Sequence, residues 1–188
     1  MKTADQTWPA SHSMNEEEEV LTLGFTESLP TGEYTLLIEF TGTLNDKLRG
    51  FYRSQYVNPE GNTEYLATTQ FESTDARKAF PCWDEPDAKA TFEITLIIPS
   101  HLKAISNMPE KTSSVIEGQR KQIQFEQSPI MSTYLIAFVI GDIESIEDTA
   151  DNDTLMRIWT TRGKTDQAKF ALDTATKLLS YLNQYSLL

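Results

Sequence analysis

Cysteine and histidine are nearly absent from this chain of 188 residues, which contains one cysteine, Cys82, and two histidines, His12 and His101. A single cysteine excludes an internal disulfide, which is compatible with a reducing compartment. Because only two histidines are available as bases, we interpret Cys82 as a small buried side chain in preference to a reactive thiol.

Positive charge and long apolar runs are also scarce. Lysine and arginine number 16 against 28 acidic residues, for a formal net charge of −12. This balance argues against nucleic acid and an anionic membrane surface as partners, because both are bound through clustered lysine and arginine. No segment approaches the roughly 20 apolar residues needed to cross a bilayer, and Met1–Ala10 has no apolar run of signal-peptide length. We therefore expect no membrane partner and a cytoplasmic protein.

What the chain does contain is a series of short alternating segments followed by one helical segment. Alternation of apolar and polar residues predicts strands, and the 3.6-residue period from Gln167 onward predicts a helix capped by Thr165 or Asp166. The predicted strands cover Leu21–Phe25, Tyr34–Phe40, Phe51–Val57, Glu64–Phe71, Ala90–Ile98, Ala104–Asn107, Lys121–Glu126, Thr133–Ile140 and Leu155–Thr160. In Lys121–Glu126 we expect Ile123 and Phe125 to point inward, and Ile143 and Ile146 are expected to continue on an edge of the sheet.

This order of elements predicts a mainly β fold, an antiparallel β-sandwich followed by one C-terminal α-helix. We expect a β-domain over residues 1–160, and a helix over residues 161–188 that begins a further, helical part. The run Thr133–Ile140 is nearly all apolar, which is typical of a strand buried on both faces.

The stretch Thr69–Pro86 is dense in groups that are costly to bury and lies between predicted strands. Polar connections of this kind commonly carry function, because the sheet positions the loop. Side chains alternate along a strand, so Gln70 and Glu72 are expected on one face and Phe71 on the other. An amide beside a carboxylate suits a cationic ligand. A solvated strand end is the alternative reading of the same spacing.

Several blocks in register across roughly Glu18–Leu188 resemble the N-terminal domain of the gluzincin zinc aminopeptidases, the aminopeptidase N-like family. The likeness covers most of the chain, so it does not depend on one motif. The blocks are Leu44–Lys47, Gly50–Ser54, Thr69–Pro86, Ser106–Met108, Met131–Leu135, Ala137–Val139 and Lys169–Leu172.

The resemblance implies a saddle-like β-domain that anchors the substrate of a zinc metalloaminopeptidase, an enzyme that releases single residues from peptide N-termini. In the Gln-x-Glu pattern, Glu72 would bind the free α-amino group and Gln70 would line the pocket for the first side chain. Zinc would be held by a catalytic domain, the partner of this one, through a His-Glu-x-x-His motif and a further glutamate. Neither His12 nor His101 sits in such a motif, so we expect no metal ligand and no activity in this chain alone.

Two further expectations follow from the same stretch. Arg77 has acids nearby in sequence and is expected to hold the loop by an ion pair, while Phe80 and Trp83 are expected to pack beneath it. The resemblance also leads us to expect a fragment incomplete at both ends. The alternatives are a stand-alone β-sandwich binding module or regulatory truncated isoform, and an incomplete gene product.

Overall fold

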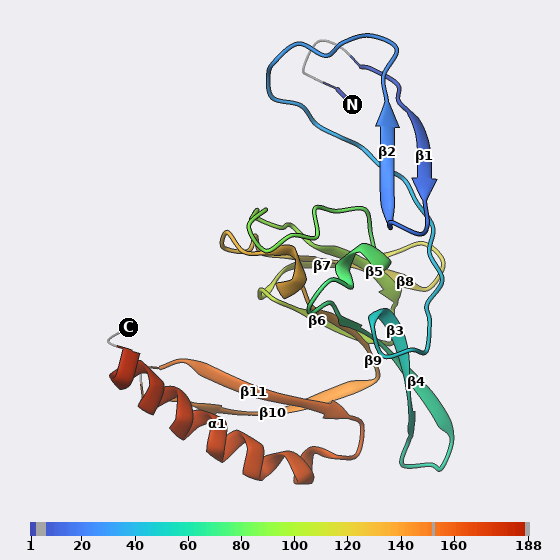
Figure 1. Ribbon diagram of the computed structural model, residues 1–188. Coiled ribbons are helices and arrows are strands. Elements are labelled where there is room, and N and C mark those ends of the chain that lie inside the picture. The colour runs from blue at the N-terminus through green and yellow to red at the C-terminus, as the bar shows by residue number, and fades with distance from the viewer. Residues whose placement is uncertain (3–6, 152, 187–188) are drawn as a thin grey trace.

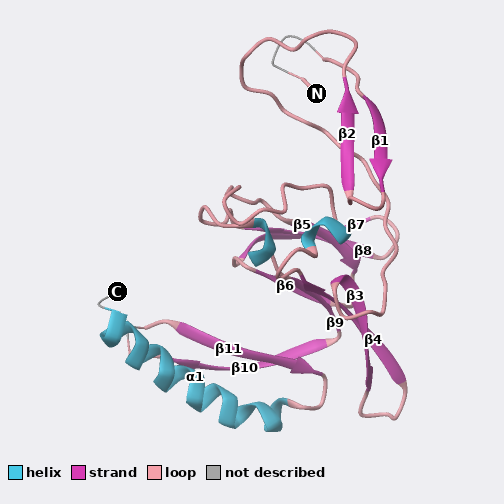
Figure 2. Cartoon of the chain, in the orientation of Figure 1, coloured by secondary structure: helices cyan, strands magenta, loops and turns pink. Residues whose placement is uncertain are grey.

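A computed structural model describes residues 1–2, 7–151 and 153–186 of the chain. Within these ranges it has eleven strands, two short 3₁₀ turns and one α-helix. All strand pairs in the sheets are antiparallel, and the helix lies at the C-terminal end (Figures 1 and 2). The predicted fold class, mainly β with one C-terminal helix, is confirmed. Nothing in the structure tests the domain boundary at residue 160, which stays a prediction.

The central sheet has the strand order β3-β4-β9-β6. The hairpin of β3 and β4 forms where alternation predicts it, with Gly50 opposite Gln70 and Val57 opposite Thr63. The strands of this sheet are β3 (Gly50–Val57), β4 (Thr63–Gln70), β6 (Lys103–Ser106) and β9 (Phe138–Gly141).

A second sheet of three strands, in the order β5-β8-β7, packs on the central one. Its buried side chains Ile98, Ile123 and Phe125 form a cluster that also contacts Ala104 and Ile140 of the central sheet. The predicted inward orientation of Ile123 and Phe125 is confirmed, and the two sheets form a small sandwich. Its strands are β5 (Thr95–Pro99), β7 (Glu110–Ile116) and β8 (Arg120–Phe125).

Two smaller units complete the fold. The hairpin of β1 (Ser11–Asn15) and β2 (Val20–Gly24) extends away from the rest of the molecule (Figure 1). At the other end, β10 (Ile143–Thr149) and β11 (Leu155–Thr161) pair with each other, and α1 (Thr165–Ser186) packs against both. The helix therefore shares its core with a two-stranded sheet and not with the sandwich.

The tip of the β3–β4 hairpin is attached to the turn before α1. The Arg162 guanidinium donates to both carboxylate oxygens of Glu60, at 2.8 and 2.5 Å, and its Nε donates to Asp142 at 2.8 Å. These bonds raise the pKa of Arg162 and lower that of Glu60. A Cβ on Gly163 would lie 2.5 Å from Pro59 Cγ, so glycine permits this close contact.

The helix α1 has a buried face, a charged face and an exposed apolar stripe. Ala168 and Leu172 are buried against β10 and β11, while Lys177 pairs with Asp173 on the charged face. The predicted helix is confirmed, although residues 187 and 188 lie outside the described residues. No helix in the described ranges is long and apolar enough to span a membrane. The stripe consists of Phe170, Leu178, Tyr181, Leu182 and Tyr185.

Three of the predicted strands differ from the structure. Tyr34–Phe40 is extended and its side chains alternate in burial, but within the described residues it has no ladder partner beyond one bridge at Thr35. Thr133–Ile140 splits into a 3₁₀ turn, η2 (Thr133–Leu135), and the short β9. In Ala90–Ile98 the regular strand begins only at Thr95. Periodicity reports which side chains are buried, whereas a strand also requires a neighbouring backbone.

Two strands were not predicted at all. β1 and β7 are almost entirely exposed, so they lack the apolar alternation from which strands are recognised. Each is an outer strand that pairs on one side only, with β2 and β8 respectively. The acidic run before Val20 forms the turn between β1 and β2, where the Asn15 side chain accepts from the backbone N–H groups of Glu17 and Glu18.

Ile123 tests the sandwich core. We expect Ile123→Ala to lower the free energy of unfolding by about 2–5 kcal/mol, because it removes a buried branched side chain and leaves a cavity between the sheets. The matched control is Val115→Ala on the neighbouring strand, where the side chain is 79% exposed and a change below about 1 kcal/mol is expected. Urea unfolding followed by tryptophan fluorescence measures both, and equal losses would contradict the assigned core.

Candidate functional site

The site begins with the burial of one aromatic side chain. Phe71, the residue after β4, is 2% exposed and packs against Ala76 and Ile136. Its ring also meets Phe80 and Phe138 edge-on, at centroid distances of 6.0 and 6.3 Å. Since adjacent side chains of an extended backbone point in opposite directions, the burial of Phe71 turns its two neighbours outward.

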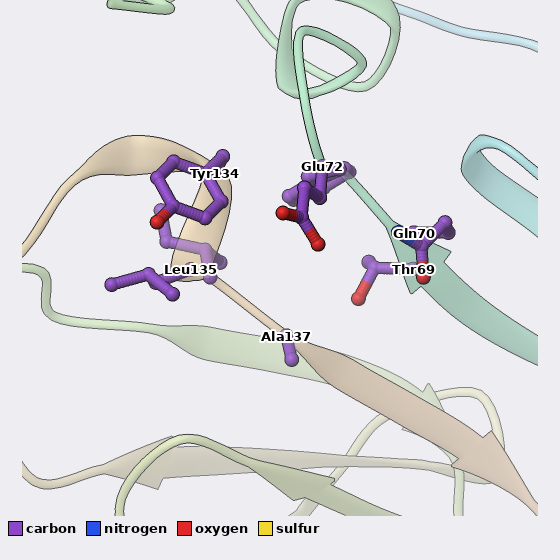
Figure 3. Close-up of a pocket in the computed structure, with 8 residues that line it drawn as sticks. Thr69, Gln70, Glu72, Tyr134, Leu135 and Ala137 are labelled. Carbon is purple, nitrogen blue, oxygen red and sulfur yellow. The ribbon is translucent and has the colours of Figure 1, made fainter. Parts of the chain in front are cut away.

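Those neighbours are Gln70 and Glu72, the two residues singled out from the sequence, and both line one pocket. The pocket is open and has a volume of about 220 Å³. In Figure 3 the Glu72 carboxylate projects into the space between the end of β4 and the turn that carries Tyr134. The remaining lining residues are Thr69, Phe71, Tyr134, Leu135, Ile136 and Ala137.

Glu72 is a carboxylate without a partner in the described part of the chain, where its side chain makes no hydrogen bond or ion pair. Two cations follow it closely in sequence, but both are engaged elsewhere. Arg77 pairs with Asp84 at 2.9 Å and Lys78 pairs with Asp75 at 2.7 Å. The pocket therefore presents an unneutralised negative charge beside an apolar wall.

The loop after Glu72 is fixed by the ion pair between Arg77 and Asp84. Asp84 is 7% exposed, and its Oδ2 accepts from both the backbone N–H and the Nε of Arg77, at 3.2 and 2.9 Å. A third bond runs from Arg77 Nη2 to the Asp84 carbonyl at 3.2 Å. These bonds raise the pKa of the guanidinium. The expectation that Arg77 holds the loop through an ion pair is confirmed, with Asp84 as its main partner.

Glycine is required where β3 begins beside this loop. Gly50 pairs with Gln70 in the ladder and has φ +67°. A Cβ there would lie 3.0 Å from the Cβ of Lys78 and 3.5 Å from the Asp75 carbonyl oxygen. The absence of a side chain lets the 3₁₀ turn η1 (Ala76–Lys78) close against the end of the strand.

The far end of the loop is attached to the opposite wall of the pocket by two hydroxyl groups. Ser132 Oγ donates to the Pro86 carbonyl at 2.6 Å, and Thr133 Oγ1 donates to the Trp83 carbonyl at 2.9 Å. Phe80 packs on Phe71 as expected, but the expectation for Trp83 is wrong, because its side chain is 71% exposed. Phe80 occupies the position beneath the loop, and Trp83 contributes only its backbone there.

Cys82 packs, half-buried, against the same cluster as Phe71. Burial raises the pKa of its thiol to about 11, and the nearby Asp84 carboxylate acts in the same direction. A thiol with a raised pKa holds little of the reactive thiolate at neutral pH. The interpretation of Cys82 as a packing residue is confirmed, and the thiol is not a candidate nucleophile.

The sequence did not reveal the apolar wall of the pocket. Tyr134, Leu135 and Ala137 lie in a run predicted to be a doubly buried strand, yet Leu135 is 47% exposed. Nothing local marks these residues, since an apolar run is equally consistent with a covered strand and with an open wall. Among the described residues, no group of three histidine, cysteine or acidic side chains could hold a metal ion, so zinc has no fitting site here.

The comparison with known protein families identifies the class to which this fold and pocket belong. The model of the Peptidase M1 N-terminal domain matches residues 2–135. The chain therefore belongs to the M1 peptidase family, through its N-terminal domain.

Individual relatives give the same assignment. The chain is 49% identical over 177 residues to aminopeptidase M1-D of Oryza sativa subsp. japonica, covering 94% of the chain and 20% of that protein. It is 42% identical over 174 residues to puromycin-sensitive aminopeptidase of Caenorhabditis elegans, and 44% over 176 residues to aminopeptidase N of Bos taurus, covering 92% and 89% of the chain and 18% of each relative. The chain thus spans about a fifth of the length of these relatives.

Asp84 tests how the loop is held. We expect Asp84→Ala to lower the free energy of unfolding by about 1–3 kcal/mol, because it leaves the Nε and the backbone N–H of Arg77 without their acceptor. The matched control is Asp173→Ala, which removes the carboxylate of an exposed helical ion pair and should cost less than about 0.5 kcal/mol. Thermal unfolding of the three chains measures the difference, and an Asp84→Ala chain as stable as the control would refute this role.

Proposed function

We propose that this chain is the substrate-anchoring N-terminal domain of a zinc metalloaminopeptidase, an enzyme that releases single residues from the N-termini of peptides. The observation that supports the proposal best is the Glu72 carboxylate, which has no partner among the described residues and lies in an open pocket with an apolar wall. The membership of the chain in the M1 family supports the reaction class. The relatives are named as aminopeptidases.

The chemistry of recognition follows from the charge of the substrate. An aminopeptidase must distinguish a free N-terminus from an internal amide, and the difference is the positive charge of the α-ammonium. Glu72 accepts charge-assisted hydrogen bonds from that ammonium, each worth about 1.5–3 kcal/mol. Gln70 lines the space taken by the first side chain. A peptide with an acetylated N-terminus has no charge for Glu72 and is rejected.

The catalytic chemistry is assigned to a different part of the longer protein. The described residues offer no zinc site, so the proposal places zinc in a catalytic domain that is the partner of this one. Bound there, zinc would polarise the scissile carbonyl and activate water. This chain contributes the binding of the N-terminus, and alone it is proposed to hydrolyse nothing.

The mass of the native protein tests whether the domain belongs to a longer enzyme. An antibody raised against Thr69–Pro86 is used to blot an extract of the source cells. We expect a band several times heavier than the 21.3 kDa of this chain, because the relatives are about five times as long. A band only near 21 kDa would contradict the proposal and favour a stand-alone binding module.

Glu72 tests the anchoring role within this chain. We expect leucinamide to shift the NMR signals of residues around the pocket, and Glu72→Gln to weaken that binding at least tenfold, because the amide that replaces the carboxylate has no charge to offer the ammonium. N-acetyl-leucinamide, which lacks the charge, should not bind either chain. The matched control is Glu64→Gln, which removes an exposed carboxylate from β4 outside the pocket. Equal affinity of the parent and Glu72→Gln chains would overturn the proposed role.

A further inference from the structure

One side-chain amide holds the apolar wall of the pocket from behind. Asn107 follows β6 directly, and its Nδ2 donates to the Leu135 carbonyl at 2.8 Å. Its Oδ1 accepts from the Ala137 N–H, also at 2.8 Å. These two backbone groups lie on either side of Ile136, so the amide engages the wall segment at both ends. Asn107 itself does not line the pocket.

The amide acts where regular sheet pairing has ended. The ladder between β6 and β9 stops at the pair of Ser106 and Phe138, and Asn107 provides the next two bonds. Around it, Ser106 Oγ donates to the Ala137 carbonyl at 2.8 Å, and Thr69 Oγ1 accepts from the Phe138 N–H at 3.1 Å. Side-chain hydrogen bonds therefore take the place of the ladder at the Leu135 carbonyl, at both backbone groups of Ala137 and at the Phe138 N–H, while the N–H groups of Leu135 and Ile136 bond within the turn η2.

Packing fixes the two sides of the pocket to different degrees. Ile136 is buried against Phe71, which also determines the direction of Glu72. Leu135 and Ala137 are exposed, with Leu135 at 47%, so packing alone leaves their positions weakly determined. The Leu135 N–H bonds to the Ser132 carbonyl at 3.1 Å within the turn η2, and the hydrogen bond from Asn107 joins the Leu135 carbonyl to the segment that follows β6.

We propose that Asn107 is a positioning residue that sets the width of the pocket between Leu135 and Glu72. This width limits the size of the first side chain with which an amine ligand fits the pocket. The ligand class is an amino-acid amide or peptide with an apolar first side chain, which contacts Leu135 while its ammonium binds Glu72. The inference rests on the proposed function, because it takes Glu72 as the ammonium anchor. Since Asn107 reaches only the wall, its loss changes the selectivity between side chains more than the affinity for the ammonium.

The test compares alaninamide and phenylalaninamide as ligands of the full 188-residue chain, with dissociation constants from NMR titration. We expect Asn107→Ala to change the alaninamide affinity less than twofold and the affinity ratio of the two ligands at least threefold. Asn107→Asp, which keeps the acceptor for Ala137 but places a carboxylate against the Leu135 carbonyl, should change the ratio likewise. The matched control is Asn45→Ala, since Asn45 also bonds two backbone carbonyls, those of Arg49 and Phe51, and its loss should leave the ratio unchanged.

A second measurement uses the parent chain alone and stands even where an Asn107 variant does not fold. The aromatic protons of bound phenylalaninamide should show nuclear Overhauser contacts to the Leu135 methyl groups. Absence of these contacts, or an unchanged affinity ratio in a folded Asn107→Ala chain, overturns the inference even where Glu72→Gln still weakens binding at least tenfold. If Glu72→Gln binds as the parent does, the proposed function itself fails, so the two failures are distinguishable.

Discussion

The burial of Phe71 is the contact on which the site depends. This one side chain ends the β3–β4 hairpin and packs against Ala76 of the following turn and Ile136 of the opposite wall. Complete burial of an aromatic side chain contributes about 1.5–3 kcal/mol, more than the roughly 0–1 kcal/mol of an exposed ion pair within the chain. The packing of Phe71 determines the path of the backbone at this point, and the outward direction of Glu72 is a consequence of that packing.

A second constraint arises because the backbone around Phe71 is irregular. Buried N–H and C=O groups outside a ladder need other partners, and here polar side chains supply them. The Asp84 carboxylate accepts a hydrogen bond from Arg77. The hydroxyl groups of Ser132 and Thr133 donate to the carbonyls of Pro86 and Trp83. The Asn107 amide donates to the Leu135 carbonyl and accepts from the Ala137 N–H. The polar residues of this region are thus mainly structural, which leaves Gln70, Glu72 and the Tyr134 hydroxyl as the polar groups that line the pocket without a partner among the described residues.

Sequence patterns predicted the parts of the fold in which burial and backbone pairing coincide. The alternation around Ile123 and the helical spacing of Ala168 and Leu172 both correspond to real elements, because each apolar face meets a neighbour. Tyr34–Phe40 alternates in the same way but has no adjoining strand in the described ranges. The apolar run after Ser132 bends where the Asn107 amide bonds its backbone and where Thr133 Oγ1 donates to the Trp83 carbonyl. Those partners lie some 30 and 50 residues away in the chain, so no local pattern contains them. For the same reason, the alternation predicted that Gln70 and Glu72 lie on one face but did not predict the wall opposite them.

The arrangement separates two properties that a binding site must set independently. In the proposed role, the charge of Glu72 would act on any ammonium group and would carry no information about the side chain next to it, whereas the apolar wall would act only on that side chain. Under the two proposals, the burial of Phe71 orients the carboxylate and hydrogen bonds to Asn107 help to hold the exposed part of the wall, so a change behind the wall would alter the wall and leave the carboxylate in place. Selectivity in the proposed site would therefore depend on Asn107, a residue that does not line the pocket.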